Sequence, residues 1–338
     1  MKQKIVLFSL LTLVLIGCKN NYTLEGSMEK SLLEFIPAGT ELGIYNRVNK
    51  EWVKIDSTLM KDDGTFVFKG RVEEPSIAYI NASDDNLLQF VLEPGHIKAT
   101  IDEEGIVRLD GTENNRLLSD FNYGIYEAET EAEALDFMRT FIADNINTIV
   151  GYNMLSDYLL FFDIDQIDAM ISNMTDETKA QPVVEKIIEK ADVLRQSAVG
   201  KQYLDVALKT PADETLSLSD LVGKTDFLLV DFWASWCGPC RRAMPQMVEL
   251  YDRFRADNKL EILGISLDDN KEAWLGAIDK LGLKWQHISD LQGWQSEGAQ
   301  LYGITSIPAT LLINKEGIIV ARNLEPEQYA ELIAAQNE

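Results

Sequence analysis

Residues 229–240 read Leu-Val-Asp-Phe-Trp-Ala-Ser-Trp-Cys-Gly-Pro-Cys, and this stretch decides the fold. Its first half is a continuous apolar run, typical of a buried strand, that contains one acidic residue, Asp231. Its second half carries two cysteines, Cys237 and Cys240, at the expected start of a helix. Residues at this spacing share one face of the first helical turn, where their sulfur atoms reach disulfide distance. The stretch therefore predicts a redox-active dithiol at the junction of strand and helix.

The two cysteines are expected to have different roles. Cys237 lies at the tip of the helix, where unpaired amide groups and the helix dipole stabilise a thiolate, so we predict that it is the nucleophile. Cys240 lies one turn inside, and we predict that it attacks the mixed disulfide second. Gly238 lets a substrate backbone approach, and Pro239 sets the helical angle without removing a needed amide hydrogen. Together with Trp236, which is expected to shield the dithiol, these two residues are predicted to border the substrate.

Two further features are predicted to belong to this site. A charged carboxylate costs several kcal/mol to bury, so Asp231 in its apolar strand indicates a proton acceptor for Cys240. The alternative is an aspartate exposed at a sheet edge. Much later in the chain come Ile307 and Pro308. If the bond between them is cis, the backbone there lies beside Cys237, pairs with an extended substrate and keeps metal ions from the dithiol.

Length and composition limit the classes of protein. The chain has 338 residues, 46% of them hydrophobic, which is enough for two or three folded units. Its net charge of -24 repels nucleic acid, which is therefore not an expected partner. Only three cysteines are present, so a disulfide-rich scaffold is excluded. The two cysteines of the motif and the distant His96 and His287 do not have the spacing of a zinc site, and no metal is expected.

The third cysteine, Cys18, belongs to the N-terminal segment. Lys2 and Lys4 lie near the start of the chain, an apolar stretch follows over 5–16, and Leu15-Ile16-Gly17 precedes Cys18. This apolar stretch of twelve residues is too short for the roughly 20 that a membrane-spanning helix needs, so a cleaved export signal over 1–17 is favoured. The segment resembles a bacterial lipoprotein signal. This resemblance implies that Cys18 becomes the lipidated first residue of a protein anchored in the cell envelope and facing the periplasm. The alternative is an ordinary secretory signal with an incidental cysteine.

Three regions are expected after the signal. Short, half-apolar runs between turn residues fill 18–111 and predict a small antiparallel β-sandwich. Helical spacing of apolar residues over 112–197 predicts a helical connector. Strands and helices alternate over 198–338, which predicts an α/β domain with a central mixed sheet and helices on both faces. The runs predicted as strands are 41–45, 53–58, 65–69, 78–81, 87–92, 97–101, 106–109, 227–232, 260–267, 309–313 and 318–320.

From about Ala198 onward, the chain resembles thioredoxin-fold proteins of the TlpA-like thiol-disulfide oxidoreductase family. The matching residues are Asp231, the Trp-Cys-Gly-Pro-Cys motif at 236–240, Pro245, and Ile307-Pro308 before a strand. Residues 263–274 resemble the insertion of the AhpC/TSA type, which plain thioredoxins lack. The β-rich region is similar to an N-terminal module of unknown function in many lipoproteins of this family.

The resemblance implies an activity. Members pass electrons between a membrane relay protein and disulfides in exported proteins, often including apocytochrome c, and hold no bound cofactor. By resemblance Cys237 is the attacking cysteine, Cys240 the resolving one, Asp231 the buried acid and Pro308 the cis-proline. Some reductive members also place a glutamate in the insertion near the dithiol. Since several acids are candidates here, none is assigned that role; they are Asp268, Asp269 and Glu272.

Several functions remain as alternatives. The Gly-Pro pair between the cysteines is that of thioredoxin, whose potential is about -270 mV against about -120 mV for a strong oxidant, so a reductase is favoured. An oxidant or isomerase is the second hypothesis. A peroxidase needs a Pro-x-x-x-Thr-x-x-Cys motif, which the sequence lacks. The non-enzymatic alternative is a surface-tethered binding protein in which the β-rich domain holds a partner.

Overall fold

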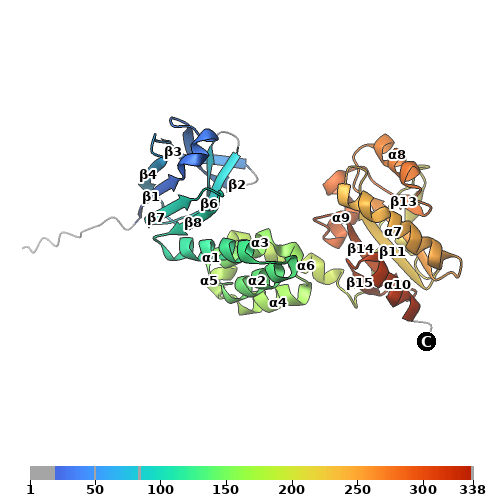
Figure 1. Ribbon diagram of the computed structural model, residues 1–338. Coiled ribbons are helices and arrows are strands. Elements are labelled where there is room, and N and C mark those ends of the chain that lie inside the picture. The colour runs from blue at the N-terminus through green and yellow to red at the C-terminus, as the bar shows by residue number, and fades with distance from the viewer. Residues whose placement is uncertain (1–19, 49–50, 83–84, 336–338) are drawn as a thin grey trace, which may run out of the picture. The chain divides into compact units, whose positions relative to one another are not determined.

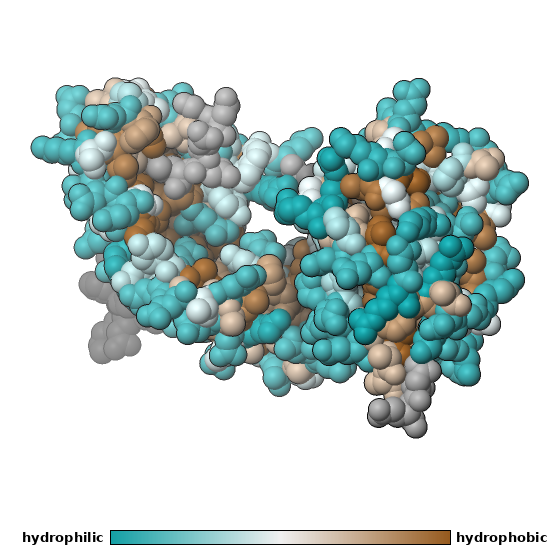
Figure 2. All heavy atoms as spheres, turned by 45° about the vertical axis from the view of Figure 1, so that its right-hand side comes forward, coloured by the Kyte–Doolittle hydropathy of each residue, from teal (hydrophilic) through white to brown (hydrophobic). Residues whose placement is uncertain are grey.

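The computed structural model describes residues 20–48, 51–82 and 85–335 (Figure 1). The predicted signal over 1–17 and the predicted lipidation site Cys18 lie outside the described residues. The chain divides into two compact units, Met1–Asp157 and Tyr158–Glu338. Among the described helices, none combines the length and the apolar character that crossing a membrane requires. On the face that Figure 2 shows, hydrophilic residues cover most of the surface, as the high content of charged residues leads one to expect.

The first unit contains the predicted β-sandwich. Its strands are β1 (Asn21–Met28), β2 (Glu41–Val48), β3 (Glu51–Leu59), β4 (Thr65–Arg71), β5 (Ser76–Ala82), β6 (Asp85–Leu92), β7 (Gly95–Ile101) and β8 (Val107–Asp110), with a 3₁₀ turn at Lys30–Glu34. They form two four-stranded sheets in the orders β4-β1-β7-β8 and β3-β2-β5-β6. Neighbouring strands in the described part of this unit are antiparallel, except that β1 and β7 are parallel. Strand β1, which the turn pattern does not predict, thus lies inside its sheet between β4 and β7.

The predicted helical connector is divided between the two units. Helices α1 (Glu113–Glu127), α2 (Glu131–Asp144) and α3 (Ile149–Asp157) belong to the first unit. Helix α1 is fixed to β6 by Asn115, whose buried side chain accepts a hydrogen bond from Val91 N at 2.9 Å and donates one to Val91 O at 2.8 Å. The second unit begins with η2 (Leu159–Phe161), α4 (Ile164–Asn173), α5 (Asp176–Lys179) and α6 (Pro182–Gln196).

The second unit has the predicted α/β architecture. After the short strands β9 (Ala207–Lys209) and β10 (Thr215–Ser217) and the 3₁₀ turn η3 (Leu218–Asp220), its elements are β11 (Phe227–Trp233), α7 (Gly238–Arg255), β12 (Leu260–Ser266), α8 (Lys271–Leu281), β13 (Gln286–Ile288), η4 (Gly293–Gln295), α9 (Glu297–Tyr302), β14 (Ala309–Asn314), β15 (Ile319–Arg322) and α10 (Pro326–Ala335). The five-stranded sheet has the order β13-β12-β11-β14-β15. Strands β11, β12 and β13 are parallel, whereas β14 and β15 are antiparallel to their neighbours, so the sheet is mixed.

Helices cover both faces of this sheet (Figure 1). Successive side chains of a strand point to opposite faces. The ring of Phe232 lies 5.8 Å from that of Tyr302 on α9, which marks one face. On the other face α7 contributes Tyr251, whose ring lies 5.4 Å from that of Trp285. Every residue of β11 is buried, since the strand lies in the middle of the sheet between these two layers.

Helix α6 is attached to the second unit through buried polar groups. Arg322 Nη1 donates to Ser197 O at 2.7 Å and to Ser197 Oγ at 2.8 Å, and Arg322 Nη2 donates to Tyr302 O at 3.3 Å. Ser197 is fully buried, and burial lowers the pKa of Arg322. These contacts give a physical reason why the second unit includes α6 and thus begins upstream of the expected domain start at 198.

Candidate active site

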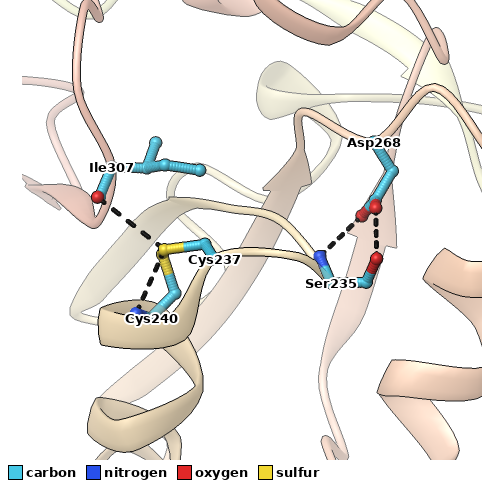
Figure 3. The surroundings of a disulfide bond; sticks show 5 residues. All are labelled: Ser235, Cys237, Cys240, Asp268 and Ile307. Carbon is cyan, nitrogen blue, oxygen red and sulfur yellow. Dashed lines mark hydrogen bonds between the residues drawn. A yellow bond between two sulfur atoms is a disulfide. The ribbon is translucent and has the colours of Figure 1, made fainter. Parts of the chain in front are cut away.

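The two cysteines of the motif form a disulfide with a Cα–Cα distance of 5.3 Å (Figure 3). Helix α7 begins at Gly238, with Pro239 in its first turn and Cys237 at the N-cap position. The backbone N–H of Cys240 donates a hydrogen bond to Cys237 Sγ at 3.1 Å. A sulfur atom in this position receives the electrostatic stabilisation that a helix N-terminus gives to a negative charge.

The disulfide is less exposed than a helix tip leads one to expect. Cys237 is 4% exposed and Cys240 is 1% exposed. The carbonyl oxygen of Ile307 lies 3.7 Å from Cys237 Sγ and covers part of the sulfur (Figure 3). In contrast Trp236, expected to shield the dithiol, is 52% exposed, and its ring lies 6.0 Å from that of the partly exposed Trp294. Trp236 and Trp294 therefore form an exposed aromatic pair next to the motif.

The segment around Pro308 lies beside the dithiol although it is about 70 residues away in sequence. The bond between Ile307 and Pro308 is cis. It precedes β14, which pairs with β11 so that Ala309 lies opposite Phe232. Strand pairing thus carries the backbone of Ile307 to Cys237. The structure brings together the sequence-predicted residues of the motif and of this later segment.

Asp231 is buried in the middle of the sheet. It lies on β11 opposite Gly264 of β12 and Thr310 of β14, and it is 3% exposed. The alternative of an aspartate exposed at a sheet edge is therefore wrong, since β11 has a neighbour on each side. Within the described part of the chain, Asp231 Oδ2 has no hydrogen-bond partner. Burial without a compensating charge raises the pKa of Asp231 to about 7, which suits a group that exchanges protons near neutral pH.

Asp268 is a site residue to which the sequence analysis assigned no role. It is 1% exposed, and its carboxylate accepts hydrogen bonds from Ser235 N at 2.9 Å and Ser235 Oγ at 2.5 Å (Figure 3). It also accepts one from Ser266 Oγ at 2.7 Å. Ser235 belongs to the loop between β11 and Cys237, so Asp268 holds this loop in place. Asp269 and Glu272 are exposed. The signal in the sequence is a serine before the cysteines and an aspartate after the next apolar strand.

His287 packs as a neutral ring between two tryptophans. It is 2% exposed and lies between Trp233 and Trp285, at ring distances of 5.5 and 5.9 Å. Burial lowers the pKa of His287 to about 3. A Cβ atom on residue 264 would lie 2.3 Å from His287 Nδ1, so Gly264 makes room for the ring. In the first unit, the half-exposed His96 lies 3.0 Å from a carboxylate oxygen of Glu25.

Comparison with known proteins supports these observations. Residues 199–322 match the family model of the AhpC/TSA family. The chain is 32% identical over 134 residues to the thiol-disulfide oxidoreductase ResA of Bacillus anthracis, a match that covers 40% of this chain and 74% of that protein. With ResA of Oceanobacillus iheyensis, the identity is 32% over 168 residues, or 48% of this chain and 76% of the relative. The chain belongs to the ResA/TlpA-like thiol-disulfide oxidoreductases of the AhpC/TSA family.

The chain is also similar to a protein of known structure. A thiol-disulfide oxidoreductase from Bacteroides fragilis is 34% identical, covers 39% of this chain and 99% of its own, and has a TM-score of 0.37. In the present chain, residues 22–118, which include the β-rich region, match a domain of unknown function, DUF4369. The sequence resemblance is thus confirmed, and enzymatic activity is favoured over the alternative of a passive binding protein.

Proposed function

We propose that this enzyme reduces disulfides in exported polypeptides, with Cys237 as nucleophile and Cys240 as resolving cysteine. The observation that carries the proposal is the position of Cys237 at the N-cap of α7, where it accepts an amide hydrogen bond at 3.1 Å and lies beside the Ile307 carbonyl. The first contact stabilises a thiolate. The second provides a backbone acceptor next to the reacting sulfur, where an extended substrate can pair.

The reaction begins with the reduced enzyme. The thiolate of Cys237 attacks one sulfur of the substrate disulfide, an S–S bond to the substrate forms, and the other substrate sulfur leaves as a thiolate that takes a proton from water. The thiol of Cys240 then loses its proton and attacks Cys237 Sγ. The Cys237–Cys240 disulfide forms, the second substrate sulfur leaves, and the substrate has gained two electrons that the enzyme has lost.

Asp231 is proposed to take the proton of Cys240 in the second step. A base is most effective when its pKa is close to the working pH, and burial raises the pKa of Asp231 to about 7. A buried carboxylate at its ordinary pKa would be a weaker acceptor. The same group returns a proton when the enzyme is reduced again. Exposed Trp236, with Gly238, Pro239 and the Ile307 backbone, is proposed to border the substrate.

The place of action is also a proposal. The lipobox-like sequence before Cys18 supports a lipid anchor in the cell envelope, with the domains in the periplasm. A membrane-bound electron-relay protein that carries a dithiol would restore the reduced enzyme by the reverse exchange. Apocytochrome c, with its paired cysteines, is a client of the proposed kind.

A redox equilibrium tests the direction of the reaction. The Cys237–Cys240 pair is equilibrated with mixtures of reduced and oxidised glutathione, and the fraction of disulfide is measured by alkylation. A potential near the thioredoxin value of about -270 mV supports the reductase, whereas one near about -120 mV supports an oxidant and contradicts the proposal. Insulin reduction tests the nucleophile, since Cys237→Ser abolishes it if the assignment is right. A Cys240→Ala variant is expected to hold clients as stable mixed disulfides.

A further inference from the structure

A groove with a basic lining is formed in part by residues that flank the two cysteines in the chain. It has a volume of about 260 Å³, lies between the first turn of α7 and helix α8, and its lining includes Ser235, Arg241, Ala273, Gly276, Ala277 and Lys280. We call it the α7–α8 groove. Ser235 stands two residues before Cys237 and Arg241 directly follows Cys240, so residues that flank the disulfide in the chain line the groove.

The two cations of the groove have no acidic partner. Arg241 and Lys280 are exposed, and neither forms an ion pair with a carboxylate of the described residues. None of the residues that line the groove has an acidic side chain. Asp268 lies behind Ser235, but it is buried and its carboxylate accepts three hydrogen bonds from the protein itself. Both cations of the groove therefore face solvent, and neither is paired with a carboxylate of the described residues.

This local charge contrasts with that of the whole chain, which is -24. A protein of this charge repels acidic molecules at long range. Two cations that face one groove also repel each other, and a carboxylate bound between them removes this repulsion. The groove has room for such a group, since a Cβ atom on Gly276 would meet nothing within 4 Å. Small residues, Ala273 and Ala277, lie on either side of this glycine.

We propose that the α7–α8 groove binds an acidic side chain of the client polypeptide, a few residues from the cysteine that Cys237 attacks. This inference rests on the proposed function and adds a substrate preference to it. An extended chain advances about 3.3 Å per residue, so a client held at Cys237 presents nearby side chains to the groove. Attachment to the reacting cysteine raises the effective concentration of that carboxylate, an advantage that a free small anion lacks.

Peptide disulfides test the preference. Each peptide carries one glutamate at a different position near its cysteine, and its counterpart carries glutamine there. The kcat/KM ratio of the two is measured with the full chain at low salt. For the best position the wild type is expected to favour glutamate by about threefold, in the range of exposed ion pairs, and about 0.5 M salt is expected to remove the preference.

Charge variants assign the effect to the groove. Lys280→Gln is expected to move the ratio toward one, and Lys280→Glu, which leaves the groove with one positive and one negative charge, to move it further in the same direction. Lys315→Gln, which removes one exposed charge from the hairpin between β14 and β15, is the matched control and is expected to keep the wild-type ratio. An unchanged ratio in both Lys280 variants, or an equal loss in the control, overturns the inference.

Two further outcomes separate the inference from the proposed function. If the wild type reduces both peptides equally well, the groove assignment fails while the reductase stands. If the wild type reduces neither peptide, the proposed function itself fails. If dithiodipropionate, a small disulfide dianion, is preferred over its neutral diamide by the same factor as the glutamate peptide over the glutamine peptide, the groove binds small anions and the client assignment is overturned.

Discussion

Replacement of Asp231 by asparagine is expected to stabilise the oxidised enzyme, and the gain should grow with pH. Burial raises the pKa of Asp231 from 3.8 to about 7. A carboxyl group with a raised pKa in the folded state stabilises the fold fully below its unfolded pKa, and this contribution is lost as the pH rises through the folded value. The asparagine side chain has no such titration because its amide stays neutral.

The size of the effect follows from the same shift. Each pKa unit corresponds to about 1.36 kcal/mol, so a shift of about three units gives about 4 kcal/mol. The unfolding free energy of the wild type should therefore fall by this amount relative to that of Asp231→Asn between about pH 4 and pH 7. It should not fall further above that range. Urea unfolding at a series of pH values measures it. Tryptophan fluorescence reports the relevant unit, because Trp52 is the one tryptophan of six that lies outside 158–338.

An exposed aspartate serves as the control. Asp257 lies in the same unit and is exposed, so Asp257→Asn should leave the stability nearly constant across the pH series relative to wild type. Subtracting each variant from wild type cancels the titration of all other groups. The prediction is refuted if the difference in unfolding free energy between Asp231→Asn and wild type is the same at pH 4 and pH 8, or if wild type is the more stable at pH 8. In either case the ionised Asp231 does not destabilise the fold.

The remaining predictions concern the proton transfer and the packing around the site. Asp231→Asn should slow the resolving step on the order of 100-fold at pH 7, measured as the decay of the mixed disulfide with substrate, and an unchanged rate would remove Asp231 from the reaction. Asp268→Ala should lower the unfolding free energy by about 2–4 kcal/mol, because it leaves the Ser235 amide without its acceptor. Urea titration measures this loss, and a loss below about 0.5 kcal/mol would contradict the role of Asp268 in holding the loop. Gly264→Ala should lower the unfolding free energy by about 2 kcal/mol or more, because its Cβ collides with the buried ring of His287. Gly276→Ala places its Cβ in open space on a helix and should raise the unfolding free energy by about 1 kcal/mol. Equal effects of the two variants would refute the packing argument.

Local sequence patterns predicted those features that depend on short stretches of chain. The apolar run before the cysteines indicated β11, and the spacing of the cysteines indicated the disulfide at the start of α7. Helix α8 has the bounds that the pattern over 271–281 predicts, since Asn270 caps one end and Gly282 the other. In such stretches, periodicity and capping act in the same direction as the tertiary structure.

Features that depend on distant pairings were not predictable in this way. Strand β1 has a turn residue, Gly26, in its interior, and Phe66 on the neighbouring strand occupies the space above it. The contact between Asp268 and Ser235 joins residues 33 positions apart. Its signal is too weak to separate Asp268 from the acids that follow it. The exposure of Trp236 was also missed, because an aromatic residue beside an apolar strand is more often packed in the core.

The attachment of α6 determines how the catalytic unit must be excised for expression. A clone that begins at residue 199, where the match to the AhpC/TSA family starts, would omit Ser197 and leave the Arg322 guanidinium short of two acceptors inside the protein. A clone that begins at 158 keeps them and retains α4 to α6. The shorter fragment should therefore be the less soluble and the easier to digest with protease, although both contain the same reactive sulfur atoms.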